Sequence, residues 1–183
     1  MDDIAAAGVD KYTSDSTTEI YSHENVIVLG NQALVIQDTL QYAEFDAFFS
    51  DVQGMSKVPV VDSVVAYYCP FTSEIYLLVM RNSLHIPIMK HNLIPTFILR
   101  LAWLTVSKVP KIHCSEPTVE DHSIYDDVTK IQIPFKLNGI LSYFPTQDLT
   151  LEYMQRCYEI KHVFLLPDAE TWDPYSKTYA LNE

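Results

Sequence analysis

Glycine and basic side chains are both scarce in this chain of 183 residues, and each shortage excludes a class of function. Four glycines leave little material for the glycine-rich turns that hold nucleotide phosphates. The 12 lysines and arginines stand against 24 aspartates and glutamates, for a formal net charge of −12. Because an acidic surface repels phosphate backbones and the basic residues do not cluster, we expect no nucleic-acid binding by this segment.

Cysteines and long apolar runs are also few. Cys69, Cys114 and Cys157 are far apart and odd in number, so at least one lies outside any internal disulfide. No C-x-x-C or H-x-x-x-H pair occurs, and we therefore predict neither a metal site nor a cofactor. The apolar stretch 93–106 is interrupted by Pro95 and is shorter than the roughly 20 residues of a membrane span, so we expect a core segment and no membrane association.

The first residues lack the basic and apolar regions of a signal peptide. We therefore expect an intracellular, cytoplasmic protein with reduced cysteines. Residues 1–18 show no apolar periodicity and are predicted to be a disordered leader. The β domain is expected over 19–166, followed by a C-terminal tail over 167–183.

The hydrophobic content of 48% is arranged in short runs rich in β-branched residues, which favour strands. The clearest pair is a hairpin whose strands, 58–68 and 75–80, flank a turn at 70–73. Further strands are predicted over 26–29, 33–36, 42–49, 131–134, 140–144 and 163–166.

Two helices are also predicted. Pro95 suits the first position of a helix over 96–104, and residues 148–150 offer an N-cap for a short helix near 151–158. The sequence thus indicates a mainly antiparallel β domain with one or two helices.

Residues 21–30, Tyr-Ser-His-Glu-Asn-Val-Ile-Val-Leu-Gly, resemble the catalytic turn of a known protease family. They are similar to the Asp-Ser-His-Ala turn and the following Val-Leu-Gly strand of the retropepsin-like aspartic proteases of copia-like retrotransposon polyproteins. The similarity extends over residues 19–183 and includes the segments 58–62, 81–87, 91–95, 109–111, 121–125, 142–146 and 182–183.

The resemblance implies a retropepsin-like closed barrel or sandwich in which a strand with an apolar pair leads into a helix that braces the turn. It also implies a homodimer in which each chain contributes one aspartate, the two carboxylates lying about 3 Å apart and sharing one proton. In this chain Tyr21 stands at the aspartate position and Glu24 at the alanine position, whereas Ser22 and His23 are retained. A phenol with a pKa near 10 cannot replace a carboxylate as a base at neutral pH, so we expect a catalytically inactive domain.

Three alternatives remain open on the sequence alone. The first is an active aspartic peptidase that uses Asp62 or that pairs with an intact protomer from another copy. Asp62 precedes Ser63 as in active turns, although the β-branched Val64 resists the positive φ that such a turn demands. The second is a non-enzymatic protein-interaction β domain. The third is an unrelated β domain in which Tyr21 is an ordinary strand residue. Candidate partners are a second copy of the chain and a peptide derived from the polyprotein.

Overall fold

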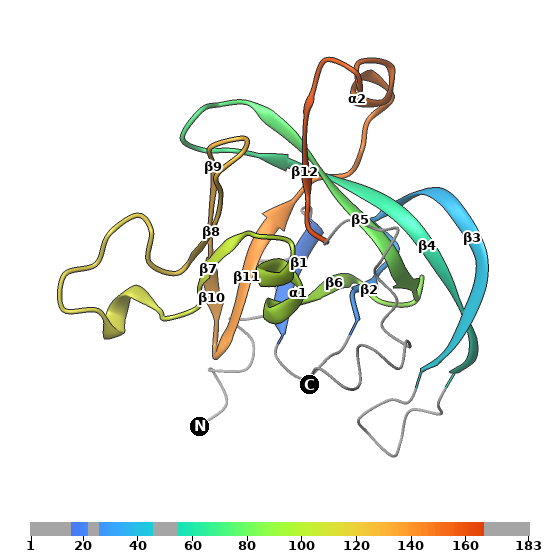
Figure 1. Ribbon diagram of the computed structural model, residues 1–183, viewed down its shortest axis with the longest axis horizontal. Coiled ribbons are helices and arrows are strands. Elements are labelled where there is room, and N and C mark those ends of the chain that lie inside the picture. The colour runs from blue at the N-terminus through green and yellow to red at the C-terminus, as the bar shows by residue number, and fades with distance from the viewer. Residues whose placement is uncertain (1–15, 22–25, 46–54, 167–183) are drawn as a thin grey trace, which may run out of the picture.

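The computed structural model describes residues 16–21, 26–45 and 55–166, which form a mainly β fold with two sheets (Figure 1). The strands are β1 (Ser16–Tyr21), β2 (Val28–Leu29), β3 (Leu34–Phe45), β4 (Met55–Tyr68), β5 (Ile75–His85), β6 (His91–Pro95), β7 (Thr105–Ser107), β8 (Ser123–Asp126), β9 (Ile131–Pro134), β10 (Lys136–Asn138), β11 (Leu141–Thr146) and β12 (Lys161–Phe164). The helices are α1 (Thr96–Leu101), α2 (Leu151–Gln155) and a short 3-10 helix, Lys111–His113.

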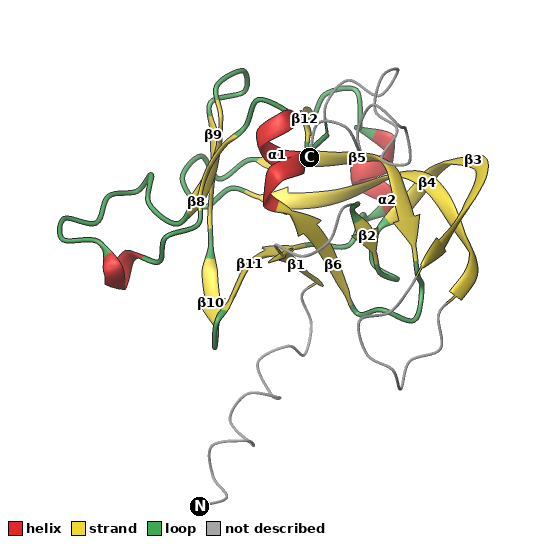
Figure 2. Cartoon of the chain, turned by 60° about the horizontal axis from the view of Figure 1, so that its bottom comes forward, coloured by secondary structure: helices red, strands yellow, loops and turns green. Residues whose placement is uncertain are grey.

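The larger sheet is mixed, with the strand order β10-β11-β1-β6-β2-β5-β4-β3 and with β12 paired in parallel to β5. The smaller sheet, β7-β8-β9, lies at the opposite end of the molecule from β3 (Figure 2). The expected mainly β fold with one or two helices is therefore confirmed, with two α-helices in the described residues. The expected closed barrel is not formed, because no strand pairing within the described ranges joins β3 to β10. Three register shifts interrupt the β3–β4 pairing, two of them with extra residues on β3, and such bulges disrupt the backbone groups that a further strand would need.

The central strands β4 and β5 are apolar on both faces. On one face, Val65 and Leu78 belong to the main core, which also contains Ile98 of α1. On the other face, Val64 and Val79 stand opposite each other and form a second cluster beneath the α2 region. The long β-branched runs of the sequence reflect this burial on both faces.

The predicted hairpin over 58–68 and 75–80 is confirmed as β4 and β5, and the predicted strand 131–134 coincides with β9. The runs 33–36 and 42–49 belong to one strand, β3, as far as Phe45, and residues 46–49 lie outside the described part. Helix α2 begins as predicted, since the Thr150 hydroxyl accepts a hydrogen bond from the Tyr153 N–H at 3.3 Å.

Helix α1 is shorter than the predicted 96–104, because a Schellman turn ends it. The Leu104 N–H donates to the Leu99 carbonyl at 3.1 Å, and the Trp103 N–H donates to the Arg100 carbonyl at 3.0 Å. Trp103 has a φ of 64°, the left-handed conformation that glycine usually supplies at this position. Leu104 is then buried in the main core, so tertiary packing ends the helix where the apolar pattern continues.

The predicted leader overlaps β1, which begins at Ser16, so the β domain starts earlier than residue 19. Thr17 and Thr18 are strand residues because β11 and β6 pair with them on both sides, a stabilisation that local composition does not reveal. The rest of the predicted leader and the predicted tail, 167–183, lie outside the described residues. Within the described ranges, no helix combines the length and apolar character needed to cross a membrane.

Candidate functional site

The candidate site is the place where β1 ends, β2 begins and α1 starts. Strand β6 lies between β1 and β2, parallel to the first and antiparallel to the second. In this register Tyr21, the last residue of β1, pairs with Pro95, and Val28 pairs with Leu93. Because Thr96 opens α1 directly after Pro95, the helix begins beside the end of β1 (Figure 1).

The start of α1 follows from the chemistry of Pro95. Its φ of −68° and ψ of 135° keep it extended at the end of β6, and its ring nitrogen offers no N–H that the helix would leave unbonded. Within the helix, Ile98 and Leu99 are fully buried in the main core. The helix is therefore anchored by apolar burial and positioned by the strand that precedes it.

A buried carboxamide joins the strands of the site. Asn92, on β6, is fully buried, and its Nδ2 donates to the Thr18 hydroxyl on β1 at 3.2 Å. Its Oδ1 accepts a hydrogen bond from the Gly30 N–H, just after β2, at 3.0 Å. A buried amide needs partners for both ends, and here each end bonds to a different neighbouring segment. Asn92 thus fixes the spacing on both sides of the central strand.

Gly30 is required at the end of β2 by close packing. A Cβ atom at this position would lie 2.6 Å from the Met89 carbonyl oxygen and 2.9 Å from that of His91. Both atoms belong to backbone, which cannot move aside as a side chain can. Alongside, His91 Nδ1 lies 2.6 Å from the Thr17 hydroxyl oxygen, a second polar contact between β6 and β1.

His85 is the titratable group next to β2, since Leu29 pairs with His85 on β5. Burial lowers the pKa of this imidazole below its usual value, and a hydrogen bond to the Gly30 backbone opposes that shift. Within the described strands β1, β2 and β6 and helix α1, Glu19 is the one residue with a carboxylate side chain. It lies two residues before the end of β1. The final position of β1, where the family resemblance expects an aspartate, carries a tyrosine.

Of the four residues of the predicted catalytic turn, the structure describes one, Tyr21. The backbone of Tyr21 is placed by its pairing with Pro95. Ser22, His23 and Glu24 lie outside the described residues, between β1 and β2.

Asp62, the alternative catalytic residue, lies elsewhere, on β4, which β5 separates from β2. Its Oδ1 accepts a hydrogen bond from the Asn82 N–H at 2.9 Å, and the β4–β5 register shifts between Val61 and Ser63. The Asp62 carboxylate therefore satisfies a backbone donor at an irregularity of the ladder.

Asn92 and Gly30 were not singled out as functional residues by the sequence analysis. The sequence did carry one signal for Asn92, which is a polar residue directly before the apolar pair 93–94 in a segment that shares the family resemblance. No three histidine, cysteine or acidic side chains gather into a metal-binding group within the described part of the chain. Comparisons with protein-family models, curated proteins and solved structures find no match to this chain.

Proposed function

We propose that this chain is a catalytically inactive retropepsin-like domain of a copia-like retrotransposon polyprotein. The observation that carries the proposal is the insertion of β6 between β1 and β2, with α1 starting beside Tyr21. The resemblance implies this relationship, in which a helix that follows an apolar strand braces the catalytic turn. The open sheet of the described residues would then be a variant of the family's closed barrel.

The proposed inactivity rests on Tyr21. An aspartic protease needs two carboxylates that share one proton, so that one activates water while the other donates to the substrate carbonyl. A homodimer of this chain would offer two phenols at these positions, and a dimer with an intact chain would offer a single acid. Neither pair provides the shared proton.

The test is an incubation of the purified chain with a peptide from the parent polyprotein between pH 4 and 7, followed by mass spectrometry. We expect no pepstatin-sensitive cleavage. Cleavage by the wild-type chain would contradict the proposal, and its loss in Asp62→Asn would assign the activity to Asp62. The bond from the Asn82 N–H to Asp62 argues against that outcome, because a catalytic carboxylate must face substrate and water.

The family assignment itself is tested by rescue. If the remainder of the site is intact, Tyr21→Asp combined with Glu24→Ala restores slow, acid-dependent cleavage. Both changes are needed because Glu24 would add a like charge near the pair. The matched control is Tyr21→Asn with Glu24→Ala, which has the same shape without the carboxylate. The assay belongs at high ionic strength, since the charge of −12 opposes dimerisation. A double variant that dimerises in sedimentation yet cleaves nothing would contradict an intact site.

A non-enzymatic binding domain is the second candidate function. It is supported by an apolar groove on the face of β4 and β5 that is turned away from the main core.

A further inference from the structure

An apolar groove with a cavity volume of about 380 Å³ lies on the sheet face formed by β3, β4, β5 and β12. Its floor includes Val64 and Val79, and its walls include Ile36, Met154 and Phe164. This volume lies within the range of about 300–1,000 Å³ that is typical of small-molecule sites.

Among the described residues, the groove stays open because α2 is too short to cover the sheet. This helix spans five residues, Leu151–Gln155, whereas β3, β4 and β5 are each more than twice as long. Ile36, Phe164 and Met154 consequently keep 56%, 47% and 45% of their surface exposed. These apolar side chains gather around a concavity and are not scattered singly. Covering them would lower the free energy, which is typical of a binding site.

One cation that borders this groove has no carboxylate partner among the described residues. Arg81, on β5, lies over the Phe164 ring, with its guanidinium carbon 5.1 Å from the ring centroid. The ion pairs among the described residues do not include it. Among the described residues, the only other basic side chain of the lining is His162, on β12.

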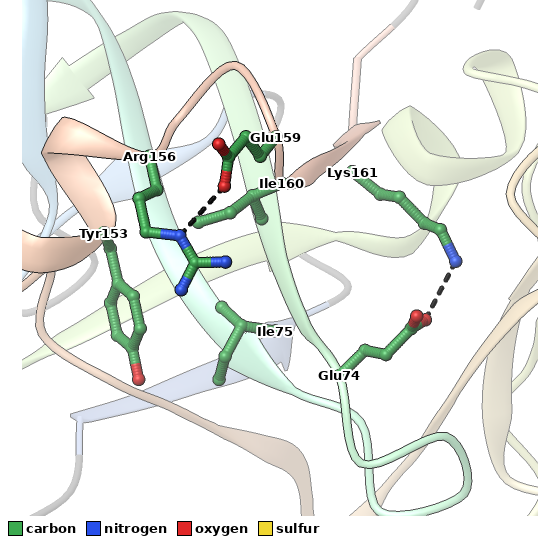
Figure 3. A pocket seen from close by; sticks show the side chains of 7 residues that line it. All are labelled: Glu74, Ile75, Tyr153, Arg156, Glu159, Ile160 and Lys161. Atoms are coloured by element: carbon green, nitrogen blue, oxygen red, sulfur yellow. Dashed lines mark hydrogen bonds and ion pairs between the residues drawn. The ribbon is translucent and has the colours of Figure 1, made fainter.

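A neighbouring groove of about 280 Å³ shows the contrasting case (Figure 3). There Arg156 Nε lies 2.9 Å from a carboxylate oxygen of Glu159, and Lys161 Nζ lies 2.8 Å from one of Glu74. Its cations are neutralised by the chain's own acids, so an added anion would have to displace them. Arg81 requires no such displacement.

We propose that the apolar groove binds a small carboxylate with an apolar chain, its hydrocarbon lying on Val79 and its carboxylate paired with Arg81. The guanidinium presents N–H donors in a planar fork that matches a carboxylate, and its carbon lies 5.1 Å from the centroid of the Phe164 ring. The formal net charge of the chain, −12, repels anions, so binding depends on this local cation. The site involves no residue of the β1–β2 turn. It is independent of the proposed inactive protease and names a ligand class for the second candidate function, the binding domain, on which it rests.

The test uses decanoate as the charged probe and decan-1-ol as the neutral probe, both below the concentration at which they aggregate. Affinities are measured by displacement of a fluorescent naphthalene sulfonate and by calorimetry. We expect wild-type protein to bind decanoate more tightly than decanol. Arg81→Gln should weaken decanoate binding by about tenfold and leave decanol binding unchanged, because a hydrogen bond to a charged group is lost.

Arg100→Gln is the matched control, since this arginine lies on α1 and does not line the groove. It should leave both affinities within about twofold of wild type. Met154→Trp fills the groove from its exposed wall and should weaken both probes, which tests the location even if Arg81→Gln does not fold. The proposal is overturned if wild-type protein does not bind decanoate, if decanol binds equally well, or if a folded Arg81→Gln variant retains full decanoate affinity.

Discussion

The side-chain oxygen of Asn92 accepts a hydrogen bond from the backbone N–H of Gly30 at 3.0 Å, and the amide nitrogen of the same side chain donates to Thr18. One buried carboxamide on β6 thus contacts the segments on both sides of the central strand of the site. Since these groups are removed from water, both bonds must be present for the arrangement to be stable.

Asn92→Ala should lower the free energy of unfolding by about 2–4 kcal/mol, because it leaves the Gly30 N–H and the Thr18 hydroxyl without this partner. Asn31→Ala, an exposed neighbour of Gly30, is the control and should change it by less than about 0.5 kcal/mol. Urea denaturation followed by circular dichroism measures both. Equal stabilities of the two variants would show that Asn92 does not join the strands.

Gly30→Ala should destabilise the fold by about 1–3 kcal/mol, because the new methyl group would lie 2.6 Å from the Met89 carbonyl oxygen. Gly139→Ala provides the comparison. That glycine has a φ of 59° and no atom within 4 Å of an added Cβ, so its cost of about 1 kcal/mol is conformational only. Chemical denaturation of both variants distinguishes steric from conformational cost, and a smaller effect at Gly30 than at Gly139 would contradict the close approach.

Trp103→Gly should stabilise the protein by about 1 kcal/mol. Trp103 has a φ of 64° at the end of α1, where glycine adopts the left-handed conformation without penalty. The indole is 92% exposed, so little packing is lost with it. Trp103→Ala removes the same ring but keeps the Cβ atom. The difference between the two variants in thermal unfolding therefore measures the cost of the left-handed backbone conformation for a residue with a Cβ atom. A glycine variant no more stable than the alanine variant would refute the assignment.

The stability of the folded chain should fall as the pH drops below about 6.5, in part through His122. This ring is 5% exposed, and its Nε2 lies 2.9 Å from the Ser142 hydroxyl oxygen. Burial, with a smaller contribution from Lys111, lowers the pKa of His122 in the folded chain. The unfolded chain therefore takes up the proton first, so stability is present above the unfolded pKa and is lost as the pH falls toward the folded value.

Denaturation at pH 7 and pH 5 measures the effect. His122→Gln should lose less stability between these values than wild type, whereas His113→Gln, at an exposed position, should behave as wild type does. His85 contributes a decrease of the same sign, since burial also lowers its pKa, so the His122 variant should retain part of the pH dependence. A wild-type pH dependence in His122→Gln would exclude the role of this side chain.

Local patterns were sufficient for elements whose signals lie within a few residues. The hairpin of β4 and β5 was predicted because two β-branched runs flank a short polar turn, and its partners are close in the sequence. The start of α2 was predicted because residues 148–150 offer an N-cap, and in the structure Thr150 provides it through an interaction that spans three residues. Strand β9, over 131–134, was predicted from a short run that contains β-branched residues.

Tertiary contacts decided the elements whose partners lie far away. Whether β1 begins at Ser16 depends on β6 and β11, which lie more than seventy residues along the chain. The end of α1 was set by the burial of Leu104 and the left-handed Trp103, which no apolar pattern signals. Local patterns likewise did not predict that the sheet stays open, because closure depends on whether edge strands that are far apart in the sequence pair with each other.

The candidate site divides in the same way. The chemistry at the end of β1 was evident from the sequence, because replacement of a carboxylate by the phenol of Tyr21 removes a base regardless of the fold. The Asn92–Gly30 bond, the bond from the Asn82 backbone to Asp62, and the groove beside Arg81 could not be predicted, because each requires the distance between residues that the chain separates. Side-chain chemistry is local to a residue, whereas desolvation, partners and access are properties of the packed chain.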